Sequence, residues 1–411
     1  MSKIQKFQLD NGVRILVEPN ETVRSAAVGL WCATGSRHER NSEAGITHLI
    51  EHMLFKGTES RSSKEIAETI EGRGGGLNAF TDKESTCYYC RVLGDDVALS
   101  VDVLSDMLLH SKIEKSDLEL EKGVVLEEIS REQDEPSSYV HDLHIENRWG
   151  NHPLGKPIIG TPGSVSSFQP KQLKNYLTEH YRAENIMLAV AGAVDPNTVV
   201  EQASKLLGGI ESGSNTNDVT VPESKIIDSY VEKDIEGVHF CIGTEGLPAN
   251  HPDSYTMLVI DEALGGNMSS RLFQEIREKR GLAYAIGTYS LRYSVAGTFN
   301  VYGGTSPETW HQVKELCLLE LDKITKHGIG EAELERIKMG LAGRIILSLE
   351  SMSSRMTRMS RNEFVYGRQI SEQELVDNIR AVDNNQIIEL AQQLFVPERI
   401  STTAIGPRLP G

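Results

Sequence analysis

The sequence predicts an α+β protein built from two structurally similar α/β-roll domains, each a mainly antiparallel sheet packed with helices. Three observations lead to this prediction. Strand-like and helix-like stretches are interleaved along the chain, the 411 residues exceed what one ordinary core accommodates, and two helical segments of the first half recur in the second. Because no apolar run approaches the ~20 residues that cross a bilayer, we expect no membrane partner.

The first half alternates strands and helices in an order that can be followed from the N-terminus. A strand pair is expected around Asp10-Asn11-Gly12, where the turn residues separate two apolar runs. Gly57 is suited to end the next helix, and Pro136 to end a later one. The expected elements are a strand over Val23–Thr34, helices over Ala44–Phe55 and Ser63–Ile70, a hairpin over Leu77–Val92, helices over Asp95–His110, Ser116–Glu135 and Tyr176–Tyr181, and a strand over Ile186–Ala193.

A linker is predicted near the midpoint of the chain. The segment Gly208–Asn217 is poor in apolar residues and rich in Gly, Ser and Asn. We therefore expect a first domain over residues 1–207, a linker over 208–230 and a second, homologous domain over 231–411.

The duplication rests on two helical segments in which the apolar spacing is kept. Ile46–Leu54 resembles Thr256–Leu264 at a shift of 210 residues, and Leu118–Ile129 resembles Leu334–Ile345 at a shift of 216. Two unrelated amphipathic helices could share part of this pattern. The chemically special residues of the first half are replaced in the second, where His48 aligns with Leu258, His52 with Glu262, Glu121 with Ile337 and Glu128 with Arg344.

Charge and cysteine content limit the partners and the compartment. The chain has 42 basic and 59 acidic residues and a net charge of −17, so we expect no nucleic-acid partner. The acidity either keeps the protein soluble or forms a cavity that attracts basic peptides. An odd number of scattered cysteines and a start without signal-peptide features favour the cytoplasm. Cys87 and Cys90 form a CxxC, but on a strand they point to opposite faces and are expected to be packing residues.

The strongest chemical motif is His48-Leu49-Ile50-Glu51-His52, an HxxEH. On a helix, His48 and His52 lie one turn apart on the same face, where two imidazoles can bind one Zn²⁺. Glu51 lies beside His52 without being needed as a ligand, which is the position of a general base for water. A histidine-bearing helix face without metal is the alternative.

A hydrolytic zinc site needs a third protein ligand. Glu127 and Glu128, in the predicted helix Ser116–Glu135, are the candidates. Glu121 precedes Glu128 by seven residues, close to two turns, so these two share a face, whereas Glu127 is rotated about 100° away from it. A solvated acidic stripe is the alternative at this spacing.

The HxxEH motif and the 76 residues between His52 and Glu128 resemble the pitrilysin family of zinc metallopeptidases, and in particular the bacterial relatives of mitochondrial processing peptidase. The resemblance covers essentially the whole chain. It implies one Zn²⁺ per chain held by His48, His52 and Glu128, with Glu51 as catalytic base and Glu121 as an acidic residue that supports the site. It also implies an edge strand that pairs with the substrate backbone, at Leu77, Asn78, Ala79, Phe80 and Thr81.

In the second half, the segment from Leu272 to Tyr284 resembles the Arg/Tyr segment of the same family. It implies that Arg277 and Tyr284 contact the substrate backbone and the developing oxyanion. A solvated basic face formed with Arg271, Lys279 and Arg280 is the alternative. The resemblance also implies a clamshell homodimer, in which the zinc half of one subunit faces Arg277 and Tyr284 of the other.

The function expected from these features is zinc-dependent endopeptidase activity on unfolded or short peptides, bound in extended form to an edge strand inside a chamber. Two rival functions are a chamber that binds peptides without cutting them and a structural subunit of a larger complex. Glu51 argues against both, because a purely structural zinc needs no base.

Overall fold

The computed structural model describes residues 4–213 and 220–410, and part of the predicted linker, residues 214–219, lies outside them. The chain forms two compact units, each assembled from three segments. Unit 1 consists of Met1–Ser130, Lys156–Asp218 and Ser348–Gln369, and unit 2 of Arg131–Gly155, Val219–Leu347 and Ile370–Gly411.

Unit 1 contains a six-stranded sheet with the order β1-β2-β6-β3-β5-β4. Only β2 and β6 pair in parallel; every other neighbouring pair is antiparallel. Its central strand places Val28 opposite Cys90 on one side and Val190 on the other. The strands are β1 (Gln5–Gln8), β2 (Arg14–Pro19), β3 (Ser25–Cys32), β4 (Gly76–Thr81), β5 (Thr86–Leu93) and β6 (Ile186–Gly192).

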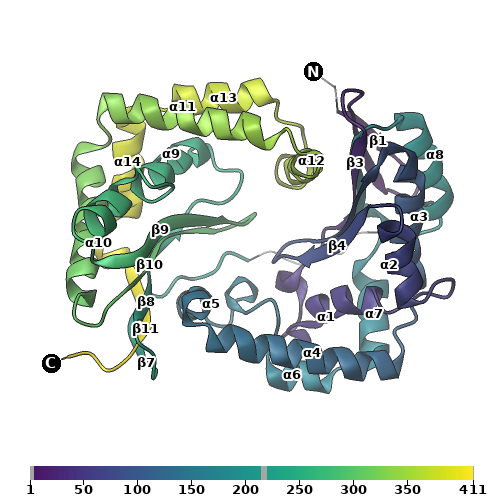
Figure 1. Cartoon of the computed structure of the whole chain (residues 1–411), viewed down its shortest axis with the longest axis horizontal. Coiled ribbons are helices and arrows are strands. Elements are labelled where there is room, and N and C mark those ends of the chain that lie inside the picture. Colours follow the sequence, from purple (N-terminus) through teal and green to yellow (C-terminus); the bar gives the residue numbers. More distant parts are fainter. Residues whose placement is uncertain (1–3, 214–219, 411) are drawn as a thin grey trace. The chain divides into compact units, whose positions relative to one another are not determined.

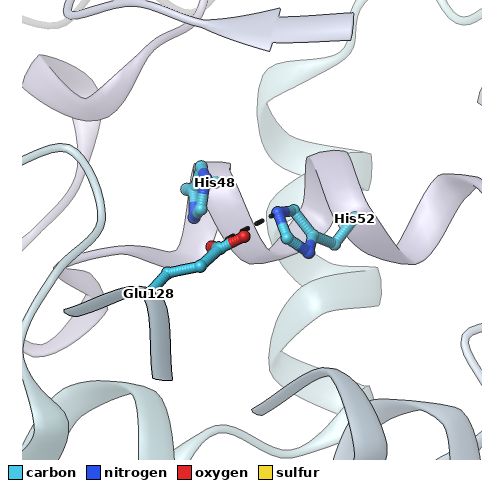
Figure 2. Close-up of side chains that lie close together, drawn as sticks. All are labelled: His48, His52 and Glu128. Carbon is cyan, nitrogen blue, oxygen red and sulfur yellow. Dashed lines mark ion pairs between the residues drawn. The ribbon is translucent and has the colours of Figure 1, made fainter. Parts of the chain in front are cut away.

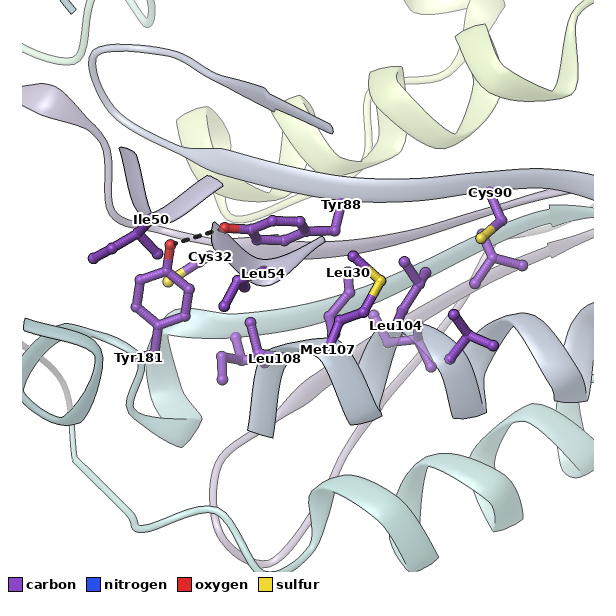
Figure 3. Packing of buried hydrophobic residues seen from close by; sticks show 14 of the residues in the cluster. Leu30, Cys32, Ile50, Leu54, Tyr88, Cys90, Leu104, Met107, Leu108 and Tyr181 are labelled. Atoms are coloured by element: carbon purple, nitrogen blue, oxygen red, sulfur yellow. Dashed lines mark hydrogen bonds between the residues drawn. The ribbon is translucent and has the colours of Figure 1, made fainter. Parts of the chain in front are cut away.

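Helices of the first half cover one face of this sheet and enclose the main core of unit 1 (Figure 3). Leu30 and Tyr88 of the sheet pack there with Met107, and the Tyr88 hydroxyl lies 3.4 Å from that of Tyr181. The helices are α1 (Ile46–Leu54), α2 (Ser63–Glu71), α3 (Val97–His110), α4 (Lys115–Asp134), α6 (Pro162–Ser167), α7 (Pro170–His180) and α8 (Pro196–Leu207).

The opposite face of the same sheet is covered by a helix from the second half of the chain, α12 (Met352–Tyr366). Met352, Met356 and Met359 pack there against the sheet in a second buried cluster. The cluster's sheet residues are Leu16, Ala27, Trp31, Cys87, Met187, Ala189 and Ala191. Cys87 thus belongs to this face and Cys90 to the opposite one. Both cysteines are free and buried, which confirms the prediction that the pair packs. Burial raises the pKa of the Cys90 thiol to about 12.

Unit 2 contains a five-stranded sheet with the order β7-β11-β8-β10-β9. Its strands are β7 (Asp228–Glu232), β8 (Val238–Gly246), β9 (Ala283–Arg292), β10 (Gly297–Thr305) and β11 (Ser401–Gly406). Its helices are α5 (Pro136–Trp149), α9 (Ser254–Leu264), the π-helical turn η6 (Phe273–Glu278), α10 (Trp310–His327), α11 (Glu331–Ser348), α13 (Glu372–Ala381) and α14 (Asn384–Leu394).

Five strands of the six-stranded sheet have the same topology as the sheet of unit 2, and β1 has no counterpart among the described residues. The β7–β11 pair is parallel, like β2–β6, and β8, β10 and β9 then follow in the positions of β3, β5 and β4. Helices also recur in the same order, because α4 and α11 begin 216 residues apart, as do α5 and α12. The expected α+β fold of two similar halves is therefore confirmed.

The helices α5 and α12 are exchanged between the halves (Figure 1). Although α5 follows α4 in the first half of the sequence, it packs on β8 and β11 of unit 2. Its counterpart α12 follows α11 in the second half and packs on β3 and β6 of unit 1. Since β3 and β6 correspond to β8 and β11, each sheet receives the equivalent helix from the other half of the chain.

The elements predicted for the first half are all present, with ends that differ by a few residues. Among residues 4–213 and 220–410, no helix combines the length and the apolar character needed to span a membrane.

Candidate active site

The site is built first on α1, which the buried residues Ile46, Leu49, Ile50, Met53 and Leu54 hold against the core of unit 1. The remaining face of this short helix carries the HxxEH motif. The rings of His48 and His52 lie side by side there, with centroids 4.7 Å apart (Figure 2). The predicted one-turn spacing of the two imidazoles is therefore present.

A buried carboxylate fixes the start of α1. Glu39 accepts hydrogen bonds from the backbone nitrogens of Gly45 at 2.8 Å and Thr47 at 2.9 Å. Burial raises the pKa of Glu39 to about 7, although the two backbone bonds and the nearby Lys83 lower it. Gly45 has φ +91°, and a side chain there would collide with the backbone of Ile159. The helix that carries the two histidines is thus held at its first turn from outside its own sequence.

The third member of the cluster comes from α4. One atom each from His48, His52 and Glu128 can be chosen so that all three lie within 4.8 Å of one another, and His52 Nε2 lies 3.7 Å from Glu128 Oε2 (Figure 2). Glu127 is exposed on the other side of the helix. The structure therefore brings together the three residues expected as ligands, and the carboxylate is the one expected.

The donor atoms suit a divalent transition metal. Within the described residues, His48 Nδ1 and Glu128 Oε2 are buried polar atoms without a hydrogen-bond partner. Burial, aided by the neighbouring His52, lowers the pKa of His48 to about 4, so this imidazole is neutral, as a ligand must be. Ligands of a tetrahedral Zn²⁺ lie ~3.4 Å apart, given bonds of ~2.1 Å. Small side-chain shifts would bring the three donors to that spacing.

Glu121 orients His52 from the opposite side of the ring. Its Oε2 lies 3.0 Å from His52 Nδ1, and its Oε1 lies 2.5 Å from the ammonium of Lys56. A carboxylate at Nδ1 favours the tautomer that is protonated there. The unprotonated Nε2, on the side of Glu128, then has a lone pair that can bind a metal. Glu121 and Glu128 both lie beside the ring of His52, so the expectation that they share a face of α4 is confirmed.

Glu51 lies outside the three-residue cluster and has its own partner. Thr81 Oγ1 donates a hydrogen bond of 2.6 Å to Glu51 Oε2. Burial raises the pKa of Glu51; the Thr81 bond and His52 oppose the shift, while Glu128 adds to it. A carboxylate whose pKa is raised, beside the three candidate ligands, is better suited to carry a proton than an ordinary exposed one.

Thr81 is the last residue of β4, which forms one edge of the unit 1 sheet. Among the residues that the structure describes, β4 pairs with β5 alone, so one side of its backbone has no strand partner there. The residues of β4 alternate between exposed and half-buried. The strand includes all five residues of the predicted edge-strand segment, Leu77, Asn78, Ala79, Phe80 and Thr81. The edge strand expected from the sequence therefore ends at the Glu51 carboxylate.

The expected Arg/Tyr pair lies in unit 2. Arg277 is exposed on η6, with its guanidinium 4.9 Å from the Phe273 ring. Its basic neighbours have carboxylate partners: Arg271 binds Glu333, and both Lys279 and Arg280 bind Glu275. Among the described residues, no carboxylate lies within ion-pair distance of Arg277. This cation is therefore available for another ligand.

Tyr284 is the second residue of β9, the last strand of the unit 2 sheet. More than half of this residue is exposed, at 55%, and its hydroxyl lies 3.1 Å from His239 Nε2 on β8. Its ring lies against the backbone of Gly304, where any side chain would collide with it. The phenol is therefore held in place while it faces solvent.

Three contacts at these sites were not predicted from the sequence, namely those of Glu39, Lys56 and His239. Lys56 lies four residues after His52, so helical spacing could have indicated a neighbour of Glu121. For Glu39 and His239 no local spacing exists, because each reaches its partner through the tertiary fold.

Comparisons with known proteins agree with this site. The model of the insulinase family, peptidase family M16, matches residues 14–162, and the model of the peptidase M16 inactive domain matches residues 167–341. The uncharacterized zinc protease YmxG of Bacillus subtilis is 39% identical over 96% of both chains. An uncharacterized zinc protease of Streptomyces coelicolor is 37% identical over 98% of this chain and 90% of its own.

Solved structures share the fold. A crystal structure of a peptidase M16 inactive domain from Pseudomonas fluorescens superposes with a TM-score of 0.92 at 20% identity, covering 99% of this chain and 98% of the other. A protease from Helicobacter pylori has a TM-score of 0.92 at 22% identity, covering 99% and 100%. With the matched family models and the full-length relatives, the expected resemblance is confirmed, and the chain belongs to the insulinase family of peptidases, family M16.

Proposed function

We propose that this protein is a zinc-dependent endopeptidase that hydrolyses unfolded or short peptides. The peptide would bind in extended form to β4 by backbone hydrogen bonds, as an added strand. The observation that carries the proposal is the position of Glu51. Its carboxylate adjoins the cluster of His48, His52 and Glu128 and also binds Thr81, the last residue of the open strand edge.

The proposed chemistry assigns one task to each group. His48, His52 and Glu128 would hold one Zn²⁺ per chain, which would supply a Lewis acid and make water a better nucleophile at neutral pH. Glu51 takes the proton of the attacking water and returns it to the leaving amine. Glu121 holds His52 in the tautomer that binds metal.

The position of the edge strand favours backbone recognition over side-chain recognition. Because β4 ends at Thr81 and Thr81 donates to Glu51, a peptide paired along β4 has its backbone led to the base. Folded proteins cannot offer a free extended segment at little cost, so unstructured peptides are the expected substrates.

We also propose a clamshell homodimer, in which the zinc half of one subunit faces Arg277 and Tyr284 of the other. Arg277 has no acidic partner among the described residues, and the Tyr284 hydroxyl is exposed and held by His239. These two groups are suited to hold a substrate carbonyl and the negative charge that develops on it. A cytoplasmic location is proposed because all five cysteines are free and buried.

The central test is Glu51→Gln. We expect this variant to retain its zinc and to lose turnover of an unstructured peptide library by at least ~10²-fold, because general-base catalysis is removed. Zinc is measured by mass spectrometry of the purified protein. If wild-type protein with a full zinc content cleaves no peptide, a binding or structural role replaces the proposed one.

A matched pair of carboxylates tests the ligand assignment. Glu128→Gln should lower both zinc content and rate, whereas Glu127→Gln, one residue away and exposed, should leave zinc content unchanged. The reverse pattern would identify the wrong carboxylate. Removal of the metal with a chelator should abolish activity in both wild type and Glu127→Gln.

The dimer has a separate test. Neither Glu51→Gln nor Tyr284→Phe should be active alone, but mixing the two should restore activity, since one of the two shared sites then has an intact base and an intact tyrosine. Sedimentation measures the dimer itself. A monomer, or a dimer without any complementation, would reject the shared site while leaving the zinc assignment in place.

A further inference from the structure

Unit 2 contains the counterparts of the two helices that carry the candidate metal ligands. α9 lies between β8 and β9 in the chain, as α1 lies between β3 and β4, and α11 starts 216 residues after α4. A buried lysine marks the same position on both long helices. Lys122 binds Glu119 at 2.8 Å, and Lys338 binds Glu335 at 3.0 Å.

In unit 2 an ion pair occupies the position that corresponds to the candidate metal site of unit 1. Glu262 is the counterpart of His52, and Arg344 is the counterpart of Glu128. Arg344 Nη2 donates to Glu262 Oε2, and Asn267 donates to the other carboxylate oxygen. His52 and Glu128 approach each other in unit 1, and the residues at their equivalent positions do so in unit 2.

The charges around this pair balance without a metal. In unit 1 the candidate metal site consists of two imidazoles and the carboxylate of Glu128, and the carboxylate of Glu121 lies beside it. In unit 2 the counterparts of His48 and Glu121 are Leu258 and Ile337, and both pack in the apolar core. Glu262 supplies a carboxylate at this position, and it is 8% exposed. Arg344 is the cation that pairs with it. The neighbouring Asp261, the counterpart of Glu51, has its own partners: it accepts a hydrogen bond from Ser290 and lies near Arg292.

We propose that in unit 2 the guanidinium of Arg344 takes the place that the metal ion takes in unit 1. This inference rests on the proposed metal site of unit 1. Unit 2 then keeps the backbone geometry of a metal site and excludes a metal by its own positive charge. Three substitutions, Leu258→His, Glu262→His and Arg344→Glu, would recreate a site for a divalent transition metal such as Zn²⁺ or Co²⁺.

An ordinary surface ion pair is the competing explanation, because the side chain of Arg344 is half exposed. The carboxylate partner differs from such pairs, since its side chain is only 8% exposed and both its oxygens accept hydrogen bonds. An exposed ion pair of unit 2, Lys326 with Asp322, offers the matched comparison.

The experiment uses the full chain with the first site removed by His48→Ala and His52→Ala. In this background we expect no bound metal, and about one Zn²⁺ per chain after the three substitutions are added, with a Co²⁺ absorption spectrum typical of tetrahedral coordination. A control with Leu258→His and Glu262→His but with Arg344 retained should bind at least tenfold more weakly. A folded triple variant without metal would overturn the proposal.

The result is independent of the proposed function, because unit 1 contributes no ligand in this background. Wild-type protein without zinc would reject the proposed function but leave the unit 2 measurement intact. If the triple variant does not fold, the natural pair decides. Arg344→Met should shift the unfolding equilibrium at least tenfold further toward the unfolded state in the presence of Glu262 than in Glu262→Gln. Equal shifts, as expected for Lys326 and Asp322, would overturn the proposal.

Discussion

The two exchanged helices occupy equivalent positions on equivalent sheets, yet α5 buries a histidine and an arginine where α12 has a serine and a phenylalanine. α12 places Met352, Met356 and Met359 on the sheet of unit 1, and Trp31 Nε1 lies 3.2 Å from the Met356 sulfur. At the positions that correspond to Met356 and Met359, α5 has Val140 and Leu143, which pack on the sheet of unit 2. Next to them α5 carries His144 and Arg148, the counterparts of Ser360 and Phe364, and both are at most 1% exposed. The position in the fold therefore demands a covering helix but does not prescribe an apolar one.

Polar groups under α5 are only partly satisfied. His144 Nδ1 lies 3.1 Å from Thr403 Oγ1, while its Nε2 has no hydrogen-bond partner among the described residues. The same holds for Nε and Nη1 of Arg148. Burying such groups costs stability at the α5 interface. α12 also has buried atoms of this kind, Asn362 Nδ2 and Glu363 Oε2, so the two interfaces are compared by experiment.

The largest expected effect comes from disrupting the apolar interface. Met356→Ser combined with Met359→Ser should destabilise unit 1 by about 5 kcal/mol or more, because two fully buried side chains are shortened and made polar. Thermal and denaturant unfolding would measure it. Arg361→Ala, at an exposed position of the same helix, is the control and should change little. A small effect of the methionine pair would mean that α12 is not needed to cover the sheet.

A gain is expected on the other sheet. Arg148→Met should stabilise unit 2 by about 1–3 kcal/mol, because it replaces a buried, incompletely hydrogen-bonded cation with an apolar side chain of similar length. Burial lowers the pKa of Arg148 to about 10, in line with this cost. Denaturant unfolding decides the sign. A loss of stability would show that the guanidinium has a stabilising anionic partner, for which the nearby Glu245 is the candidate.

The third effect is a pH dependence at His144 of α5 that its counterpart on α12 lacks. Burial lowers the pKa of His144 from 6.5 to about 3. Between these values the unfolded chain binds a proton that the folded chain does not, so stability falls as the pH drops from 6.5 toward 3, by up to about 1.4 kcal/mol per pH unit. His144→Gln should flatten this slope in denaturant unfolding at several pH values. An unchanged slope would assign the acid sensitivity to other groups. The counterpart on α12, Ser360, cannot titrate.

Local sequence patterns were sufficient to predict which candidate site residues lie close together, but not to predict the exchange of α5 and α12. His48, His52 and Glu51 lie on one short helix, so their spacing determines their geometry, and Glu121 and Glu128 are fixed relative to each other in the same way. Periodicity shows that a helix has a buried face, but it does not show which sheet that face covers. The exchange of α5 and α12 depends on the paths of the connections, which no window of sequence reports.

The same limit applies to the alignment of the two halves. The replacement of Glu128 by Arg344 could be read from the sequence, but the contact of Arg344 with Glu262 could not, because the two residues are 82 positions apart on different helices. The cap of α1 by Glu39 was missed for a related reason, since the carboxylate bonds to backbone nitrogens, which have no sequence signature.

The unpaired side of β4 has a consequence for handling the protein. The open side of an edge strand presents backbone groups that any unfolded chain in the same solution, including another copy of this one, can pair with. Crowded or partly denatured preparations are therefore expected to seed edge-to-edge association at Gly76–Thr81. The excess of acidic side chains, with a net charge of −17, opposes such self-association through mutual repulsion, and high salt should weaken that protection.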